Sequence, residues 1–256
     1  MKISQDRITL NLNGEAEVSV TGFIAPVEYT QYNFHVEWDE LANLQVAEPE
    51  KQYPASVFQA FLPSESVSVG ECWEIQEEGV LTLLKQLHPN PRLKLTIDSG
   101  DSRGLWGCLR AYNDELADIV FRIHAEFIME SGKFTPSQFA GHLVVDRLQE
   151  KIVSFKMYVP PTTLNFDAGW TQEDGGTFAE IGYCPQMELC ADTQPHDVEF
   201  AASITQEEAE SALSSHFYKF QQINWVSLEE ALEMAPAQEK PIHVISIDGP
   251  LFDEAC

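Results

Sequence analysis

Cysteine is the residue type in this chain whose chemistry points most directly to a function. The chain has five cysteines, which are widely spaced and include no C-x-x-C pair. The sequence therefore predicts neither a disulfide framework nor a zinc cage. Cys184 and Cys190, in GYCPQMELC, are the closest two, but their separation suits no common redox or zinc loop. We interpret them as two separate small hydrophobic side chains. The other three are Cys72, Cys108 and Cys256.

Cys256 stands in the context most typical of a reactive thiol. It closes residues 240–256, KPIHVISIDGPLFDEAC, in which an apolar run at residues 242–247 is followed by Asp-Gly-Pro. An apolar run that ends in turn residues is typical of a buried parallel strand. A cysteine between such a strand and a following helix would have its thiolate stabilised by the helix N-terminus. The pattern is similar to the opening of a redox domain, and Cys256 is its most reactive-looking residue.

A second chemistry would be metal binding through two histidines and one carboxylate. His124 and Glu126 lie two apart in FRIHAEF, whose alternation predicts a strand that places both on one face. With His142 from the predicted strand GHLVVD, they could form a two-histidine, one-carboxylate metal site. The alternative, which we favour, is that His124 and Glu126 are hydrogen-bonded groups that stabilise the sheet. We accordingly predict no metal and no other cofactor.

The elements that must position these residues are mostly strands. Between residues 8 and 187 the dominant period is two, which predicts a mainly antiparallel β body. A helix is predicted at residues 77–87, where apolar residues recur at helical spacing and PNP follows. A shorter one is predicted at residues 135–139, where proline suits a first helical turn. The predicted strand segments are ITLNLN, EVSVTGFI, YNFHVEW, SVSVGECWEI, LKLTID, LWGCLRAY, IVFRIHAEF, GHLVVD and IVSFKMYV.

The pattern becomes helical after about residue 200. TQEEAESALSSHF begins at Thr205 with glutamates that suit a helix N-terminus, and Ser227 with Glu230 has the form of a capping box before a helix that Pro236 closes. We predict an α+β chain in three parts. These are a β-rich domain at residues 1–200, a helical connector at residues 201–239, and the start of an α/β unit at residues 240–256.

The overall charge restricts the partners. Fifteen Lys and Arg against 41 Asp and Glu give a net charge of -26, which repels nucleic acid and anionic lipid surfaces. No stretch has enough consecutive apolar residues to span a bilayer, and the first residues lack the pattern of a signal peptide. We expect an acidic, soluble, cytoplasmic protein that binds no nucleic acid. Because 44% of the residues are hydrophobic, the charge does not indicate a disordered chain.

Three stretches resemble the selenoprotein N family. The first is FRIHAEF with FTPSQFAGHLVV, at residues 121–127 and 134–145. The second is YVPPTTLNFDAGW with EIGYCPQMEL, at residues 158–170 and 180–189. The third is the tail at residues 240–256, and the resemblance as a whole covers about residues 54–256.

The tail resembles the approach to the family's redox centre. In that family a strand and a short loop lead into Ser-Cys-selenocysteine-Gly on a thioredoxin-like domain. Cys256 matches the family's cysteine, and Ala255 stands where the vertebrate proteins have serine. The resemblance implies that residues 240–256 begin a truncated thioredoxin-like domain. It also implies a bacterial-type homologue in which selenocysteine would follow Cys256.

The resemblance implies a selenocysteine-dependent thiol–disulfide oxidoreductase as the full-length parent. A selenol is ionised at neutral pH and attacks disulfides or peroxides, and Cys256 would resolve the mixed intermediate. The expected substrates of the parent are protein thiols and disulfides, or peroxide. The chain ending at Cys256 is expected to be inactive by itself. The alternative function is a non-catalytic protein- or ligand-binding β-rich module in which Cys256 has no role.

Overall fold

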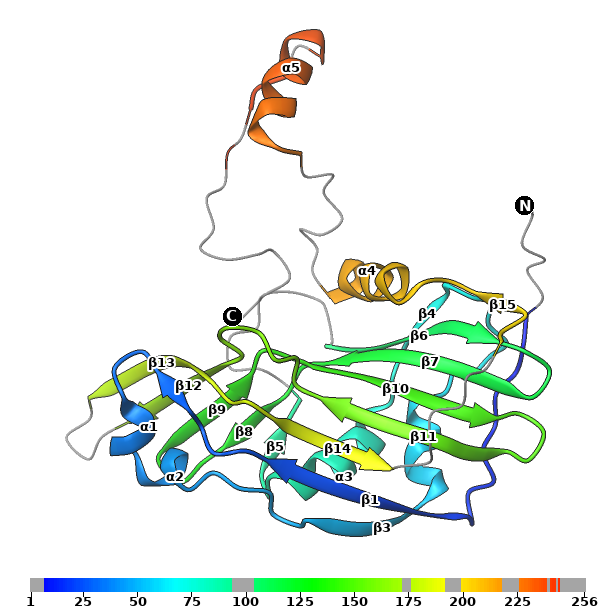
Figure 1. The fold of residues 1–256 in the computed structure, drawn as a ribbon, viewed down its shortest axis with the longest axis horizontal. Helices are drawn as coiled ribbons and strands as arrows, with labels where there is room; N and C mark the ends of the chain where they lie inside the picture. The colour runs from blue at the N-terminus through cyan, green and yellow to red at the C-terminus, as the bar shows by residue number, and fades with distance from the viewer. Residues whose placement is uncertain are drawn as a thin grey trace.

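The computed structural model describes residues 7–93, 104–171, 176–191, 199–217, 226–238, 240–242 and 244. Figure 1 shows two antiparallel sheets, together with helices on their faces. This architecture confirms the predicted α+β class. Within the described residues no helix has both the length and the apolar composition needed to cross a membrane.

The larger sheet has the strand order β15-β6-β7-β10-β11-β14-β1-β3, and β4 pairs with β6 in addition. Its neighbouring strands all pair antiparallel. The bounds are β1 (Glu17–Ile24), β3 (Glu50–Pro54), β4 (Cys72–Glu74), β6 (Leu105–Tyr112), β7 (Leu116–Ile123), β10 (Phe139–Asp146), β11 (Lys151–Tyr158), β14 (Met187–Ala191) and β15 (Ala202–Ser203).

The smaller sheet lies at the left of Figure 1 and has the order β2-β13-β12-β9-β8-β5. Aromatic side chains cluster at this end, where the ring of Trp170 lies 5.6 Å from that of Phe34 and 6.0 Å from those of Trp38 and Phe178. The strand bounds are β2 (Tyr29–Thr30), β5 (Pro91–Arg92), β8 (Glu126–Ile128), β9 (Gly132–Pro136), β12 (Phe166–Thr171) and β13 (Thr177–Tyr183).

Helices cover the larger sheet on both faces. The main hydrophobic core includes Leu109 and Phe121 of the sheet together with Leu83 of α3. The side chains between them in sequence, such as Cys108 and Val120, point the other way and pack under α4. With both faces covered, β7 is buried along nearly its whole length instead of alternating. The helices are α1 (Phe34–Glu37), α2 (Asp39–Ala42), the 3₁₀-helix η1 (Ala55–Phe61), α3 (Glu77–Leu87), α4 (Gln206–Phe217) and α5 (Leu228–Gln238).

Local pattern predicted several elements correctly. The predicted helix at residues 77–87 coincides with α3, and LWGCLRAY coincides with β6. The capping box predicted at Ser227 is present, and Thr205 caps α4 in the same way. The Thr205 hydroxyl accepts from the Glu208 amide at 3.1 Å, and the Ser227 hydroxyl accepts from the Glu230 amide at 3.2 Å. Helix α5 runs to Gln238 and contains Pro236 in its last turn. The prediction that Pro236 ends this helix is therefore wrong.

Several of the predicted elements differ from the structure. ITLNLN, predicted as a strand, contains only an isolated bridge at Ile8, and all but Leu93 of the predicted strand LKLTID lies outside the described residues. YNFHVEW, predicted as a strand, contains helix α1, and Asn33 enters it with a φ of 64°. There the spacing of Phe34 and Trp38 lets both rings contact Trp170, so the aromatic residues follow a helical turn rather than a strand face. Residues 135–139, predicted as a helix, lie at the end of β9 and the start of β10. Tertiary pairing of Phe166 with Pro136 and of Phe139 with Ile123 overrides the local signal.

The tail differs from its prediction where it can be compared. Ile242 is 37% exposed and Val244 is 68% exposed, and neither lies in a strand. The rest of the predicted strand, and Cys256 with it, falls outside the described residues. The thioredoxin-like domain and the three-part division of the chain therefore stay predictions.

Candidate functional site

The structure brings two cysteines together that the sequence keeps far apart. Cys72 on β4 lies directly opposite Cys108 on β6 in the antiparallel register. The Cys108 thiol is hydrogen-bonded to Cys72, and neither is in a disulfide. We call them the thiol pair.

The ladder bonds define which kind of position the thiol pair occupies. The Ile75 amide donates to the Leu105 carbonyl at 3.0 Å, and the Leu109 amide donates to the Glu71 carbonyl at 3.2 Å. Since hydrogen-bonded and non-hydrogen-bonded positions alternate along an antiparallel pair, Cys72 and Cys108 occupy a non-hydrogen-bonded position. At such positions the Cα atoms are about 4.5 Å apart and the side chains lie closest.

The two thiols differ in exposure and in acidity. Cys72 is partly exposed, whereas Cys108 is fully buried. The hydrogen bond from Cys108 lowers the pKa of Cys72, although burial and the nearby Glu71 carboxylate act in the opposite direction. The same hydrogen bond, together with burial, raises the pKa of Cys108. The more accessible sulfur is therefore also the one that ionises more readily.

Helix α4 covers the buried member of the thiol pair. Ala209 and Leu213 of α4 pack with Cys108 and Val120 in a small apolar cluster, and Cys72 lies at its margin. Polar contacts beside this cluster also connect α4 to the sheet. The Arg122 Nη1 donates to the Ser214 hydroxyl at 2.9 Å, and the rings of Trp106 and His216 stack at 4.3 Å.

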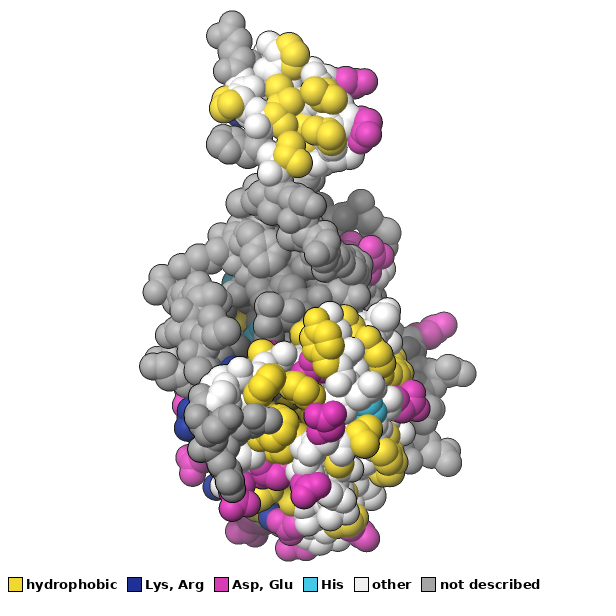
Figure 2. Space-filling view, turned by 90° about the vertical axis from the view of Figure 1, so that its left-hand side faces the viewer, with side chains coloured by type: hydrophobic (Ala, Val, Ile, Leu, Met, Phe, Trp, Pro, Cys, Tyr) yellow, Lys and Arg dark blue, Asp and Glu magenta, His cyan; other side chains and the backbone are white. Residues whose placement is uncertain are grey.

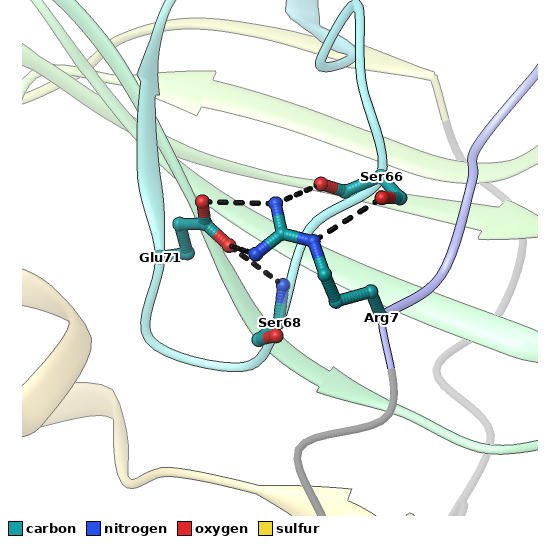
Figure 3. A network of polar contacts seen from close by, with 4 residues as sticks. All are labelled: Arg7, Ser66, Ser68 and Glu71. Atoms are coloured by element: carbon teal, nitrogen blue, oxygen red, sulfur yellow. Dashed lines mark hydrogen bonds and ion pairs between the residues drawn. The ribbon is translucent and has the colours of Figure 1, made fainter.

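The loop that leads into Cys72 is held by one arginine. Figure 3 shows the Arg7 guanidinium between Ser66 and Glu71. Its Nη1 lies 2.9 Å from a Glu71 oxygen, and its Nε donates to the Ser66 hydroxyl at 3.2 Å. The Glu71 carboxylate also accepts from the Ser68 amide at 3.0 Å. The Ser68 bond, followed by that from Arg7, lowers the pKa of Glu71, so the residue before Cys72 carries a negative charge.

Sequence reasoning missed the thiol pair because strand partners are not local information. The usable signal was that SVSVGECWEI and LWGCLRAY are both predicted strands with a central cysteine. The intervening helix α3 allows the two strands to return to each other, but the pattern alone does not say that they pair.

The three residues considered as a possible metal site do not come together. FRIHAEF is not one strand, because β7 ends at Ile123 and β8 of the other sheet begins at Glu126. His142 lies opposite Val120, four residues along the strand from His124, or about 13 Å. The expected same-face pair of His124 and Glu126 is therefore wrong. In the part of the chain that the structure describes, no group of three or more His, Cys, Asp or Glu side chains could hold a metal ion.

Each of these residues has other partners instead. The buried Glu126 carboxylate lies 3.5 Å from Arg92 and 3.9 Å from Lys133. His142 Nδ1 lies 3.3 Å from Asp118, whose other oxygen accepts from Arg110 Nε at 2.6 Å. Burial acts to raise the pKa of Asp118, but His142 and Arg110 hold it below the usual value.

Of the remaining cysteines, Cys184 and Cys190 fit the interpretation as separate small hydrophobic side chains, and Cys256 lies outside the described residues. The buried Cys184 thiol is 3.5 Å from the Ala25 and Gln186 carbonyls, and burial raises its pKa to about 11. Cys190 sits on β14 opposite Thr21 and Lys156, in a register that does not pair it with Cys184. The structure does not describe Cys256, the predicted catalytic residue.

Comparison with known proteins identifies relatives across most of the chain. Selenoprotein N of Danio rerio is 30% identical over 79% of this chain, and that of Mus musculus is 27% identical over 82%. Selenoprotein N of Homo sapiens is also 27% identical over 82%. The chain spans about half the length of these relatives, 45% to 48%. No profile of a known protein family and no solved structure matches it. We conclude that the chain is related to the selenoprotein N family.

Proposed function

We propose that this chain functions in thiol–disulfide exchange as part of a redox protein of the selenoprotein N type. The observation that carries the proposal is the sequence relationship over about four fifths of the chain. The thiol pair supports it independently, since the described body contains two sulfurs in contact with unequal acidity. The proposed reacting residue of the C-terminal segment is Cys256.

The proposed chemistry is an exchange of sulfur or selenium partners. In a longer parent that carries the family's selenocysteine after Cys256, the selenolate would attack a substrate disulfide, and Cys256 would then release the bound half. The β body would be connected to this C-terminal segment by α4 and the residues that follow α4 in the sequence. Substrates of this class are protein disulfides, small disulfides and peroxides.

The experiment is a disulfide-reductase assay on the full-length gene product. We expect Cys256→Ser to abolish most of the turnover with a small aromatic disulfide, because the thiol beside the proposed selenocysteine, which would resolve the selenium–sulfur intermediate, would be absent. Cys190→Ser is the matched control, since Cys190 is a partly exposed thiol of the β body. Equal turnover by Cys256→Ser and the parent would contradict the proposal.

A second candidate is a non-catalytic protein-binding module, and an exposed apolar end of the molecule favours it. Tyr32 and Val36 are 66% and 68% exposed beside the aromatic cluster of the smaller sheet. Figure 2 looks at this end and shows hydrophobic side chains gathered among acidic ones. Exposed aromatic patches of this kind are typical of contact surfaces.

A photo-crosslinking residue would test this second candidate. Placed at position 36, it should give a discrete adduct with one protein partner in cells. Placed at Leu148, which is 72% exposed on the Asp146–Lys151 turn, it should not. The same adducts at both positions would show that no specific surface lies at this end.

A further inference from the structure

We propose that Cys72 and Cys108 form a second redox centre, independent of Cys256, which reduces a disulfide substrate and closes into a cross-strand disulfide. The centre lies within the β body, where β4 pairs with β6. It goes beyond the proposed function, because it needs neither selenium nor the C-terminal segment.

Strand geometry permits the bond. The expected Cα separation of about 4.5 Å at a non-hydrogen-bonded pair falls within the range of about 4.4–6.8 Å that disulfides span. The side chains already point to the same side of the sheet and are hydrogen-bonded to each other. The bond can therefore form without moving either strand. Because the separation is near the short end of the range, the disulfide should also be readily reduced.

Exposure assigns different roles to the two sulfurs. Cys72 sits at the margin of the α4 contact and is accessible, so it is the sulfur that a substrate can reach. Cys108 is sealed by Ala209 and Leu213, so it reacts only through Cys72. The hydrogen bond from Cys108 supports the same assignment. It favours the thiolate of Cys72, and the thiolate is the form that attacks a disulfide.

The reaction balances in two steps. The Cys72 thiolate attacks one sulfur of a substrate disulfide, forms a mixed disulfide with it, and expels the other half as a thiolate. The Cys108 thiol loses its proton and attacks the Cys72 sulfur, which releases the second half and leaves a Cys72–Cys108 disulfide. Two electrons pass from the thiol pair to the substrate, and the two protons of the cysteines are taken up by the two released thiolates. A reducing dithiol or two monothiols would regenerate the pair.

The test uses the full 256-residue chain and glutathione disulfide as the probe. After incubation under non-denaturing conditions and trapping of the remaining thiols, peptide mapping should find the Cys72 and Cys108 peptides joined. Cys256→Ser should give the same joined peptides, which separates this proposal from the proposed function. A Cys256→Ser chain in which Cys72 and Cys108 both stay reduced, at a disulfide excess that oxidises a free peptide thiol, would overturn the inference.

Single substitutions test the order of the steps. In Cys108→Ala, the resolving sulfur is absent, so a glutathione adduct should accumulate on Cys72. In Cys72→Ala, Cys108 should remain a free thiol, because the probe cannot reach it. Cys184→Ala removes another buried thiol and should leave the Cys72–Cys108 bond unchanged. Equal adduct formation on either cysteine in the single variants would contradict the assigned roles. Circular dichroism of each variant establishes whether it is folded. If a variant does not fold, the peptide map of the wild-type chain still tests whether Cys72 and Cys108 form a disulfide.

Discussion

At the scale of single residues, burial and neighbouring charge give chemically similar side chains different properties. The thiols of Cys72 and Cys108 differ in the direction of their pKa shifts although they face each other. His124 and His142 differ in their surroundings. His142 pairs with Asp118, whereas His124 is half-buried beside the Arg122 charge. These differences lead to two predictions.

The first concerns His124. Burial, with the charge of Arg122, lowers the pKa of His124 from 6.5 to about 4, and a hydrogen bond with the Ser137 backbone only partly opposes this. As pH falls below the unfolded value, the unfolded chain takes up a proton that the folded chain does not. The free energy of unfolding should therefore fall between about pH 7 and about pH 5, and this residue should contribute about 2 kcal/mol to that fall.

Urea unfolding of the wild-type chain and of His124→Gln at both pH values measures this contribution. The many carboxylates act equally in both proteins, so the difference between the two slopes isolates His124. Parallel pH profiles for the two proteins would show that folding does not lower the pKa of His124, which would contradict the prediction.

The second prediction concerns Glu71, the carboxylate before Cys72. Its negative charge disfavours the Cys72 thiolate. Glu71→Gln keeps an oxygen that can accept from the Ser68 amide but removes the charge. We expect Cys72 to be alkylated by iodoacetamide a few-fold faster at about pH 7.5, because more of it is ionised. Glu65→Gln changes an exposed carboxylate six residues before Glu71 and should leave the rate unchanged. A slower reaction in Glu71→Gln would contradict the prediction.

At the scale of elements, some positions in the sheets accept only glycine, because the backbone of the neighbouring strand lies too close for a Cβ atom. Gly141 on β10 has the Lys156 carbonyl oxygen and the Phe121 ring where a Cβ atom would be, both at 2.2 Å. Gly169 on β12 has only the flexible Lys133 side chain nearby, at 3.4 Å. The same residue type thus meets a rigid obstacle on one strand and an ordinary contact on the other.

This contrast predicts different costs for one substitution. Gly141→Ala should lower the free energy of unfolding by about 2–4 kcal/mol, because the carbonyl of the paired strand β11 must move. Gly169→Ala should change it by less than about 1 kcal/mol. Denaturant unfolding of both variants measures these two changes in the free energy of unfolding. Similar small changes in both would mean that β11 moves away from β10 at little cost.

How far the sequence predicts these elements depends on whether their signals are local. Helix α3 and strand β6 follow from periodicity, because each buries one continuous face. Helix α1 was not predicted, since its aromatic residues pack on Trp170 from a distant strand. The site follows the same rule. The family resemblance and the choice of Cys256 as a candidate reactive thiol follow from sequence motifs. The contact between Cys72 and Cys108 depends instead on the pairing of β4 with β6, which no local motif encodes.

At the scale of the whole molecule, the dominant feature is a net charge of -26. Repulsion among carboxylates destabilises a compact chain, and salt screens it. We expect the thermal unfolding midpoint to rise as sodium chloride is increased from about 0.05 M to about 0.5 M, where the screening length falls to a few ångströms. Potassium chloride should act equally if screening is the cause. A midpoint that falls with either salt would show that favourable ion pairs outweigh the repulsion.

The outermost strands of the two sheets affect how the protein behaves at high concentration. An open sheet edge offers unpaired backbone groups to other chains and promotes aggregation. Here β15 and β2 each span only two residues as described, and β3 carries Lys51 and ends in Pro54. Because lysine resists burial and proline supplies no amide hydrogen, these edges are poor templates for a further strand. The β body should therefore remain monodisperse on concentration, despite the number of strands that it contains.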